Sequence, residues 1–133
     1  MATEYSLQAW INANTSLLDL IKAETGAATI KIKSAANVTL AEVVIDETAN
    51  SAVNGTTGVL TLAILTQEDS TTEGTASYAQ VCDGAGNPHI QLPCQAGTAA
   101  VAGYCVVNTL NILAGQAFDV LSASIGVGDV IGA

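Results

Sequence analysis

The hydrophobic pattern of the chain changes its period once, at Gly26, and this change constrains the fold more than any other feature. Before Gly26, apolar side chains recur at the spacing of one face of an amphipathic helix: Leu7, Trp10, Ile11, Leu18 and Ile21. Ser6 is a suitable N-cap, and Gly26 follows the last apolar position. We therefore expect a single helix from Ser6 to Thr25, within an N-terminal segment of residues 1–26.

After Gly26 the pattern is that of short strands. In residues 28–34, Ile30 and Ile32 alternate with Lys31 and Lys33, as in a strand with one buried face. Further candidate strands, each bounded by turn-forming residues, are 39–46, 58–65, 75–83, 89–94, 103–112 and 117–125. Because no second helical pattern separates them, we expect a mainly β fold: an antiparallel, jelly-roll-like β-sandwich of about seven or eight strands with one N-terminal helix. The sandwich would span residues 27–126, with a C-terminal tail at 127–133, and the whole chain would form one domain.

The charge of the chain is strongly acidic and unevenly distributed. The formal net charge is −9, and the three basic residues, Lys22, Lys31 and Lys33, all lie in the first quarter of the sequence. Binding to a nucleic-acid backbone requires Lys or Arg side chains that neutralise phosphates, so we expect no nucleic-acid partner. An anionic membrane surface is disfavoured for the same reason.

The N-terminus lacks the basic and apolar regions of a secretory signal, and the longest apolar run, residues 59–65, is too short to span a membrane. We therefore expect a soluble protein that is made in the cytosol. The three cysteines, Cys82, Cys94 and Cys105, are odd in number and have no CxxC spacing. This pattern favours reduced, buried thiols over a disulfide framework.

Residues 73–90 gather Cys82, Asp83, a glycine-rich turn and the only histidine, His89, in one short window. A zinc site would have to use Cys82, His89, Cys94 and Cys105, but these lack the close ligand pairs of structural zinc sites. A hydrolase would need a recognisable nucleophile motif beside His89, and none is present. The alternative is a hairpin through residues 84–87, with Asp83 bonding the backbone of its own turn. We expect this hairpin, and accordingly no catalytic residue, no metal and no cofactor.

Four segments resemble a group of small structural proteins of tailed bacteriophages. They are "ATIKIKS" (28–34), "GVLTLAIL" (58–65), "GTASYAQVCDGAG" (74–86) and "AGQAFDVLSASI" (114–125), following an N-terminal helix that ends in Gly. The resemblance covers nearly the whole chain and contains no catalytic signature. It implies a non-enzymatic virion protein with a β-sandwich core, of the kind that decorates or cements the outside of the capsid.

On this resemblance the expected partner is the major capsid protein, and the expected location is the capsid surface of the virion. We expect a homotrimer or homodimer, because symmetric assembly is the usual way for a small domain to bury enough surface. Candidate capsid contacts combine large apolar side chains of the helix with the lysine-bearing strand: Leu7, Trp10, Ile11, Leu18, Lys31 and Lys33. Two alternatives remain open. One is a head-to-tail connector or tail-tube subunit, and the other is a host-receptor or glycan-binding module.

Overall fold

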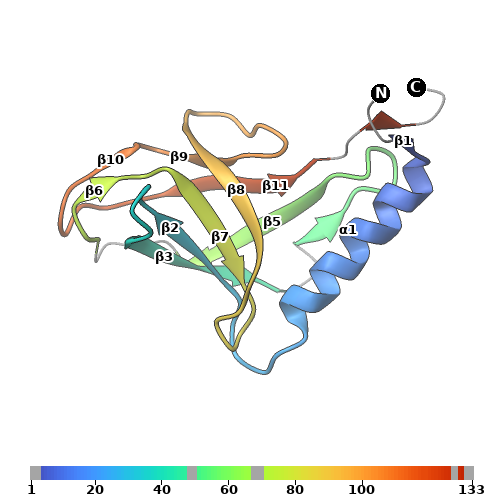
Figure 1. The fold of residues 1–133 in the computed structure, drawn as a ribbon, viewed down its shortest axis with the longest axis horizontal. Helices are drawn as coiled ribbons and strands as arrows, with labels where there is room; N and C mark the ends of the chain where they lie inside the picture. The colour runs from blue at the N-terminus through green and yellow to red at the C-terminus, as the bar shows by residue number, and fades with distance from the viewer. Residues whose placement is uncertain (1–3, 48–50, 67–70, 127–128, 131–133) are drawn as a thin grey trace.

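The computed structural model describes residues 4–47, 51–66, 71–126 and 129–130. This part of the chain forms one helix and twelve strand segments, of which eight make one large mixed sheet (Figure 1). The strands of the large sheet are β2 (Thr29–Lys33), β3 (Thr39–Asp46), β4 (Ala52–Val53), β5 (Leu60–Thr66), β7 (Tyr78–Cys82), β8 (Pro88–Ala96), β9 (Cys105–Val107) and β11 (Val120–Ile125). The expected mainly β fold with an N-terminal helix is confirmed.

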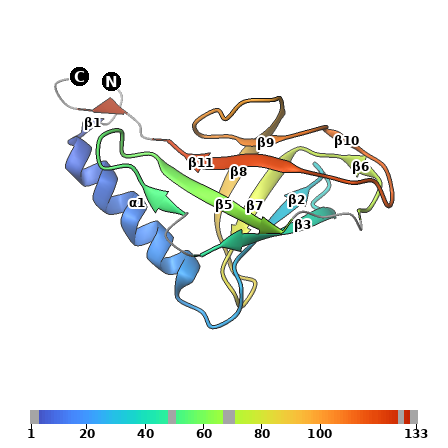
Figure 2. The same cartoon turned by 180° about the vertical axis from the view of Figure 1, so that it is seen from behind.

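The large sheet closes on itself. Its strand order is β11-β9-β8-β7-β2-β3-β5-β4, and β11 also pairs with β5, so seven strands form a continuous ring with β4 beside β5. Figure 2 shows β5 and β11 running side by side where the ring closes. The two faces expected of a sandwich are thus joined along both edges. Within the ring only the β8–β9 pairing is parallel, and this makes the sheet mixed where the sequence pattern had indicated antiparallel strands.

Strands are present in all seven segments expected from the sequence, but two of the segments are not single strands. Residues 103–112 divide into β9 and β10 (Asn111–Ile112), and residues 75–83 divide into β6 (Gly74–Thr75) and β7, with β6 and β10 outside the large sheet. The alternation predicted for β2 holds, since Ile30 and Ile32 are fully buried while Lys31 and Lys33 are half-buried on the outer side. The inside of the ring is filled by aliphatic residues from every strand and by one aromatic ring. The largest fully buried side chains include Phe118, Ile30, Ile32, Ile45, Leu60, Leu62, Ile112, Val43, Val81 and Val107.

Two small strand pairs lie outside the ring. β6 (Gly74–Thr75) pairs with β10 (Asn111–Ile112) in an antiparallel sense. β1 (Glu4–Tyr5) pairs in parallel with β12 (Asp129–Val130), which places these two short segments together near the start of the helix (Figure 1). Part of the expected C-terminal tail is therefore paired, and its remaining residues lie outside the described ranges.

The helix α1 (Leu7–Lys22) begins as the sequence predicts. The Ser6 hydroxyl accepts a hydrogen bond from the Ala9 N–H at 3.1 Å, which satisfies one of the free amides of the first turn. The helix ends at Lys22 rather than at Thr25, and the Ala23 N–H bonds the Leu20 carbonyl to close the last turn.

The helix packs on its own domain. It contacts β4, β5 and β8, and because β5 and β8 are separated by other strands on both sides of the ring, it lies across one end of the ring. Its buried residues are Asn14, Leu18 and Ile21. The Asn14 amide also donates a hydrogen bond of 2.7 Å to the Gly58 carbonyl, which fixes the helix to the turn that leads into β5.

Two glycines allow the end of the helix connection to approach the β7–β8 turn. A Cβ on Gly84 would lie 2.1 Å from the Gly26 carbonyl oxygen, and a Cβ on Gly26 would lie 2.5 Å from the Gly84 carbonyl oxygen. Real Cβ atoms do not come this close to backbone atoms. Gly26 and Gly84 therefore hold the segment after α1 directly against the hairpin, backbone to backbone.

Replacement of Ile21 tests whether the helix is part of the core. Ile21→Ala removes a fully buried side chain, and we expect it to lower the free energy of unfolding by about 2–5 kcal/mol. Leu20→Ala is the matched control, because Leu20 is on the same helix with 52% of its surface exposed, and its effect should stay within ~0.5 kcal/mol. Urea unfolding of both variants measures the difference. Equal effects would show that the helix is not docked as described.

Replacement of Gly84 tests the contact between the two glycines. Gly84→Ala forces a methyl group against the Gly26 carbonyl, so we expect a loss of about 1–3 kcal/mol in the free energy of unfolding. Gly55→Ala is the control, since no atom lies within 4 Å of a Cβ built there. The same urea titration applies, and an unaffected Gly84→Ala midpoint would mean that the connection is free to move away.

Candidate functional site

The β7–β8 hairpin brings Asp83 and His89 into contact. Asp83 is 5% exposed and follows β7 directly. Its Oδ1 accepts hydrogen bonds from the Ala85 N–H at 2.9 Å and the Asn87 N–H at 3.0 Å, and its Oδ2 lies 2.8 Å from His89 Nε2. The hairpin predicted from the sequence is confirmed, and so is the role of Asp83 in bonding the backbone of its own turn.

The hydrogen bonds to Asp83 favour its ionised form. The contact with His89 lowers the pKa of the Asp83 carboxyl most, and the backbone amides of Asn87 and Ala85 lower it further, against the opposing effect of burial. Both carboxylate oxygens are thereby engaged in holding the turn. The pair therefore has an evident structural task.

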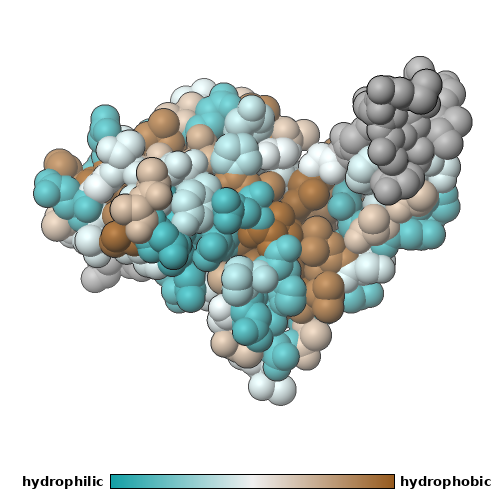
Figure 3. All heavy atoms as spheres, viewed as in Figure 1, coloured by the Kyte–Doolittle hydropathy of each residue, from teal (hydrophilic) through white to brown (hydrophobic). Residues whose placement is uncertain are grey.

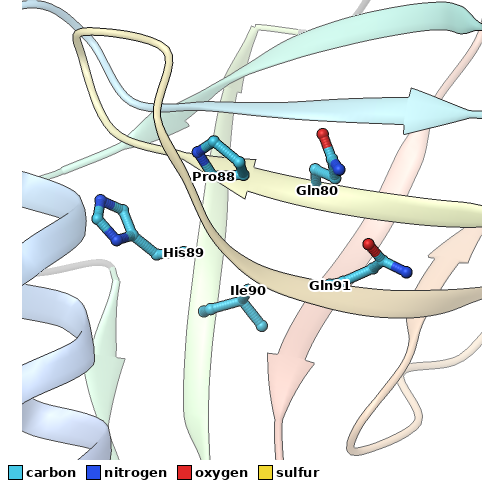
Figure 4. Close-up of a pocket in the computed structure, with 5 residues that line it drawn as sticks. All are labelled: Gln80, Pro88, His89, Ile90 and Gln91. Carbon is cyan, nitrogen blue, oxygen red and sulfur yellow. The ribbon is translucent and has the colours of Figure 1, made fainter. Parts of the chain in front are cut away.

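A hollow of about 220 Å³ lies along β7 and β8 beside this hairpin. Its lining residues are Gln80, Pro88, His89, Ile90 and Gln91 (Figure 4). Gln80 and Gln91 are register partners on the two strands, whereas His89 points away from them toward the helix. The hollow thus offers two amide groups for hydrogen bonding, and its one titratable side chain is turned toward Asp83.

Cys82, the cysteine nearest to this pair in sequence, is not arranged as a nucleophile. It is buried, its Sγ lies 3.8 Å from the Gln80 carbonyl as a weak donor, and burial raises the pKa of its thiol. A raised pKa leaves less of the reactive thiolate. The geometry at this hairpin therefore supports a structural interpretation of the cluster.

The structure separates the four residues weighed for zinc into two groups. Cys82 and His89 lie near the hairpin, whereas Cys94 and Cys105 are direct register partners on β8 and β9. The sequence spacing gave no close pair of cysteines, and the parallel β8–β9 pairing, which was not foreseen, makes neighbours of Cys94 and Cys105. Within the described ranges, no group of three or more His, Cys, Asp or Glu side chains is placed to hold a metal ion.

A second candidate surface lies on the outer side of β2 and β7. We call it the lysine face and define it by Lys31, Lys33, Tyr78 and Gln80, where Lys31 registers with Gln80 and Lys33 with Tyr78. Both lysines are half-buried, and among the residues that the structure describes neither is in an ion pair. Glu42 on β3 is the register partner of Lys31 on the other side. The lysine face thus presents two cations with one acidic neighbour, Glu42, in a chain whose net charge is −9.

The lysine face is held in place by its surroundings. The Tyr78 hydroxyl donates a hydrogen bond of 2.7 Å to Asn37 Oδ1, which ties β7 to the turn between β2 and β3. Asn37 has a φ of 65°, a left-handed conformation that Asn tolerates better than most residues. This hydrogen bond and the β2–β7 pairing therefore hold the turn, β2 and β7 together, and Lys31 and Lys33 extend from this hydrogen-bonded backbone.

The apolar contact candidates of the helix fall into two sets. Leu7, Trp10 and Ile11 are half-buried, whereas Leu18 belongs to the core beneath the helix. Figure 3 shows apolar residues gathered where the helix meets the sheet. Only the first set has surface available to a partner. The sequence did not single out the large apolar side chains that are exposed elsewhere: Leu20, Val38, Leu65, Tyr104, Leu113 and Leu121.

Comparison with protein-family models, with curated proteins and with solved structures found no match to this chain. The one helix described is too short and too polar to cross a membrane.

Acid titration tests the role of Asp83. Its pKa lies below the ordinary value of 3.8, so its contribution to stability is present above pH 3.8 and is lost as the pH falls through the lower, folded-state pKa. Asp83→Asn keeps an Oδ1 acceptor but removes the charge. We expect its melting temperature to be below that of the parent at pH 5 to 6, with the difference shrinking toward pH 2. Asp119→Asn, at an exposed site, should show no such convergence. A constant difference for Asp83→Asn at every pH would contradict this assignment.

Proposed function

We propose that this chain is a non-enzymatic structural protein of a tailed-phage particle, which binds the outside of the assembled capsid as a homo-oligomer and stabilises it. The observation that carries the proposal is the lysine face. It is the one place where the described outer surface of the ring presents two neighbouring cations, and it suits an acidic patch on a shell protein. The resemblance of the strand and turn segments supplies the class of particle.

The electrostatics favour a protein partner over a nucleic acid. Residues 1–33 contain three acidic and three basic side chains and are formally neutral, so the whole net charge of −9 arises in residues 34–133. A chain with this balance repels packaged DNA over most of its surface. Two lysines on a rigid strand can instead orient the protein on an acidic surface and speed its association at low salt.

The ring architecture supports contact through side chains. Strand addition requires an edge strand with free N–H and C=O groups, and each of the seven described strands of the ring has a paired neighbour on both sides, which leaves the two-residue strand β4 as the edge of the large sheet. We therefore expect a partner to recognise the outer faces. Lys31 and Lys33 provide the polar part of such a contact, and the half-buried Leu7, Trp10 and Ile11 provide an apolar part at the helix.

Stabilisation of a shell follows from mass action. A protein that binds the assembled capsid but not the separated subunits shifts the disassembly equilibrium toward the particle, by an amount that grows with its concentration relative to Kd. Bridging of neighbouring shell subunits explains this preference, because each subunit supplies only part of the surface that the protein binds. The complete binding surface exists only on the assembled shell. Assembly itself would not require the protein.

Charge-matched variants test the proposed surface. Lys31→Gln combined with Lys33→Gln shifts the net charge by two units, from −9 to −11, and Lys22→Glu on the exposed last turn of the helix makes the same change. We expect the double variant to lose at least roughly tenfold in affinity for empty heads, as the loss of about 1.4 kcal/mol from two ion pairs would produce. Lys22→Glu should bind like the parent. Cosedimentation at low and high salt measures both.

The outcomes separate the surface from the function. Equal loss in both variants would show a general charge effect and would rule out the lysine face. Binding of the parent chain to tail tubes and not to heads would instead favour the connector alternative. Point substitutions are preferable to removal of residues 1–24, because that deletion would also take Leu18 and Ile21 out of the core. Circular dichroism of each variant checks that the fold is intact.

A further inference from the structure

Cys94 and Cys105 lie side by side in the only parallel pairing of the ring. They are direct register partners on β8 and β9, so their side chains leave the sheet on the same face. Both belong to the inner side, since Cys105 is fully buried in the core and Cys94 is half-buried against it. Paired strands lie about 4.7–4.9 Å apart, which falls within the span of roughly 4.4–6.8 Å between the Cα atoms of a disulfide. The register and the strand spacing are therefore compatible with a bond between them.

The two thiols are also chemically unequal. The hydrogen bond with the Cys105 thiol holds the pKa of Cys94 below its ordinary value of 9.0, although burial acts in the opposite direction. The same hydrogen bond, together with burial, raises the pKa of Cys105 far above that value. Cys94 is also the more exposed of the two. One thiol is thus the more accessible and the other is its buried neighbour, as in a reactive and resolving pair.

We propose that Cys94 and Cys105 form a reversible thiol–disulfide couple, which a peroxide converts into a disulfide between β8 and β9. In the first step the Cys94 sulfur attacks a peroxide oxygen, the O–O bond breaks, and hydroxide leaves and becomes water with the released thiol proton. The product is a sulfenic acid on Cys94. In the second step the Cys105 sulfur attacks the Cys94 sulfur, the S–O bond breaks, and the hydroxyl leaves as water with the Cys105 proton. The two thiols lose two electrons and the peroxide gains them.

The disulfide would link β8 to β9 covalently within the ring. β8 and β9 are joined by the eight residues 97–104, and the parallel pair cannot be supported by a tight hairpin turn. A disulfide between the strands removes conformations of this loop from the unfolded chain. The proposal does not depend on the capsid function, because it concerns the folded chain by itself. It implies that the Cys94–Cys105 disulfide forms when the protein moves from a reducing to an oxidising environment.

Thiol counting on the full-length protein tests the couple. The reduced protein has three free cysteines, so N-ethylmaleimide should add three labels after unfolding. After treatment of the folded protein with a small excess of hydrogen peroxide, we expect one label on the parent, none on Cys82→Ser and two on Cys94→Ser. Dithiothreitol should restore the original number in each case. Intact mass spectrometry reads these counts directly.

Peptide mapping identifies the bonded pair. Because all three lysines precede residue 34 and there is no Arg, trypsin leaves every cysteine in one fragment. Cleavage before Asp83 and after Tyr104 instead places Cys82, Cys94 and Cys105 on separate peptides. We expect the Cys94 and Cys105 peptides to remain joined after oxidation and to separate on reduction.

A stability measurement provides an independent result. The oxidised parent and oxidised Cys82→Ser should melt roughly 5–10 °C higher than their reduced forms. Cys94→Ser should show no such rise. The proposal is wrong if three thiols survive oxidation of the folded parent, if the bond includes Cys82 or joins two chains, or if Cys94 accumulates as a sulfinic acid.

Discussion

The fold depends on the pairing of β11 with β5. Without it the large sheet would be an open, twisted layer with free edges at β11 and β4, and its apolar inner face would lack a second wall. With it the strands enclose one core, into which every strand of the ring contributes buried aliphatic side chains. The helix can then cover one end, because Leu18 and Ile21 meet a core that is already closed on its sides. The packing of the helix against one end therefore depends on closure of the ring of strands.

Much of this architecture could be predicted from the sequence, because it follows from patterns that extend over only a few residues. The N-cap at Ser6, the alternation in residues 29–33 and the turn chemistry around Asp83 each act over a few residues. Closure of the ring and the parallel β8–β9 pair could not be predicted. They depend on which distant strands meet, and a strand such as Cys105–Val107, buried at all three positions, carries no alternation that would indicate its neighbours.

The candidate sites divide in the same way, into contacts between residues near in sequence and contacts set by the register of distant strands. The contact of Asp83 with His89 is local, so the sequence window 73–90 pointed to it, and its structural interpretation came from turn propensity. The partnership of Cys94 with Cys105 is set by register, which spacing along the chain does not reveal. The lysine face lies between these cases, because alternation predicted that Lys31 and Lys33 share a face, whereas their neutral neighbours on β7 became visible only in the folded sheet.

Closure of the ring also determines when the chain can fold. In the β5–β11 pairing Leu62 is the partner of Ala123, and these residues are 61 positions apart in sequence. Long-range pairings of this kind slow folding, since the entropy of a large loop is lost before the contacts form, and all-β domains rich in such pairings typically fold in milliseconds to seconds. On the ribosome, the ring cannot close until Ile125 has left the exit tunnel. The edge of β5 that pairs with β11 therefore stays unpaired while the 61 positions from Leu62 to Ala123 are synthesised, and this interval is when the nascent protein is most exposed to aggregation.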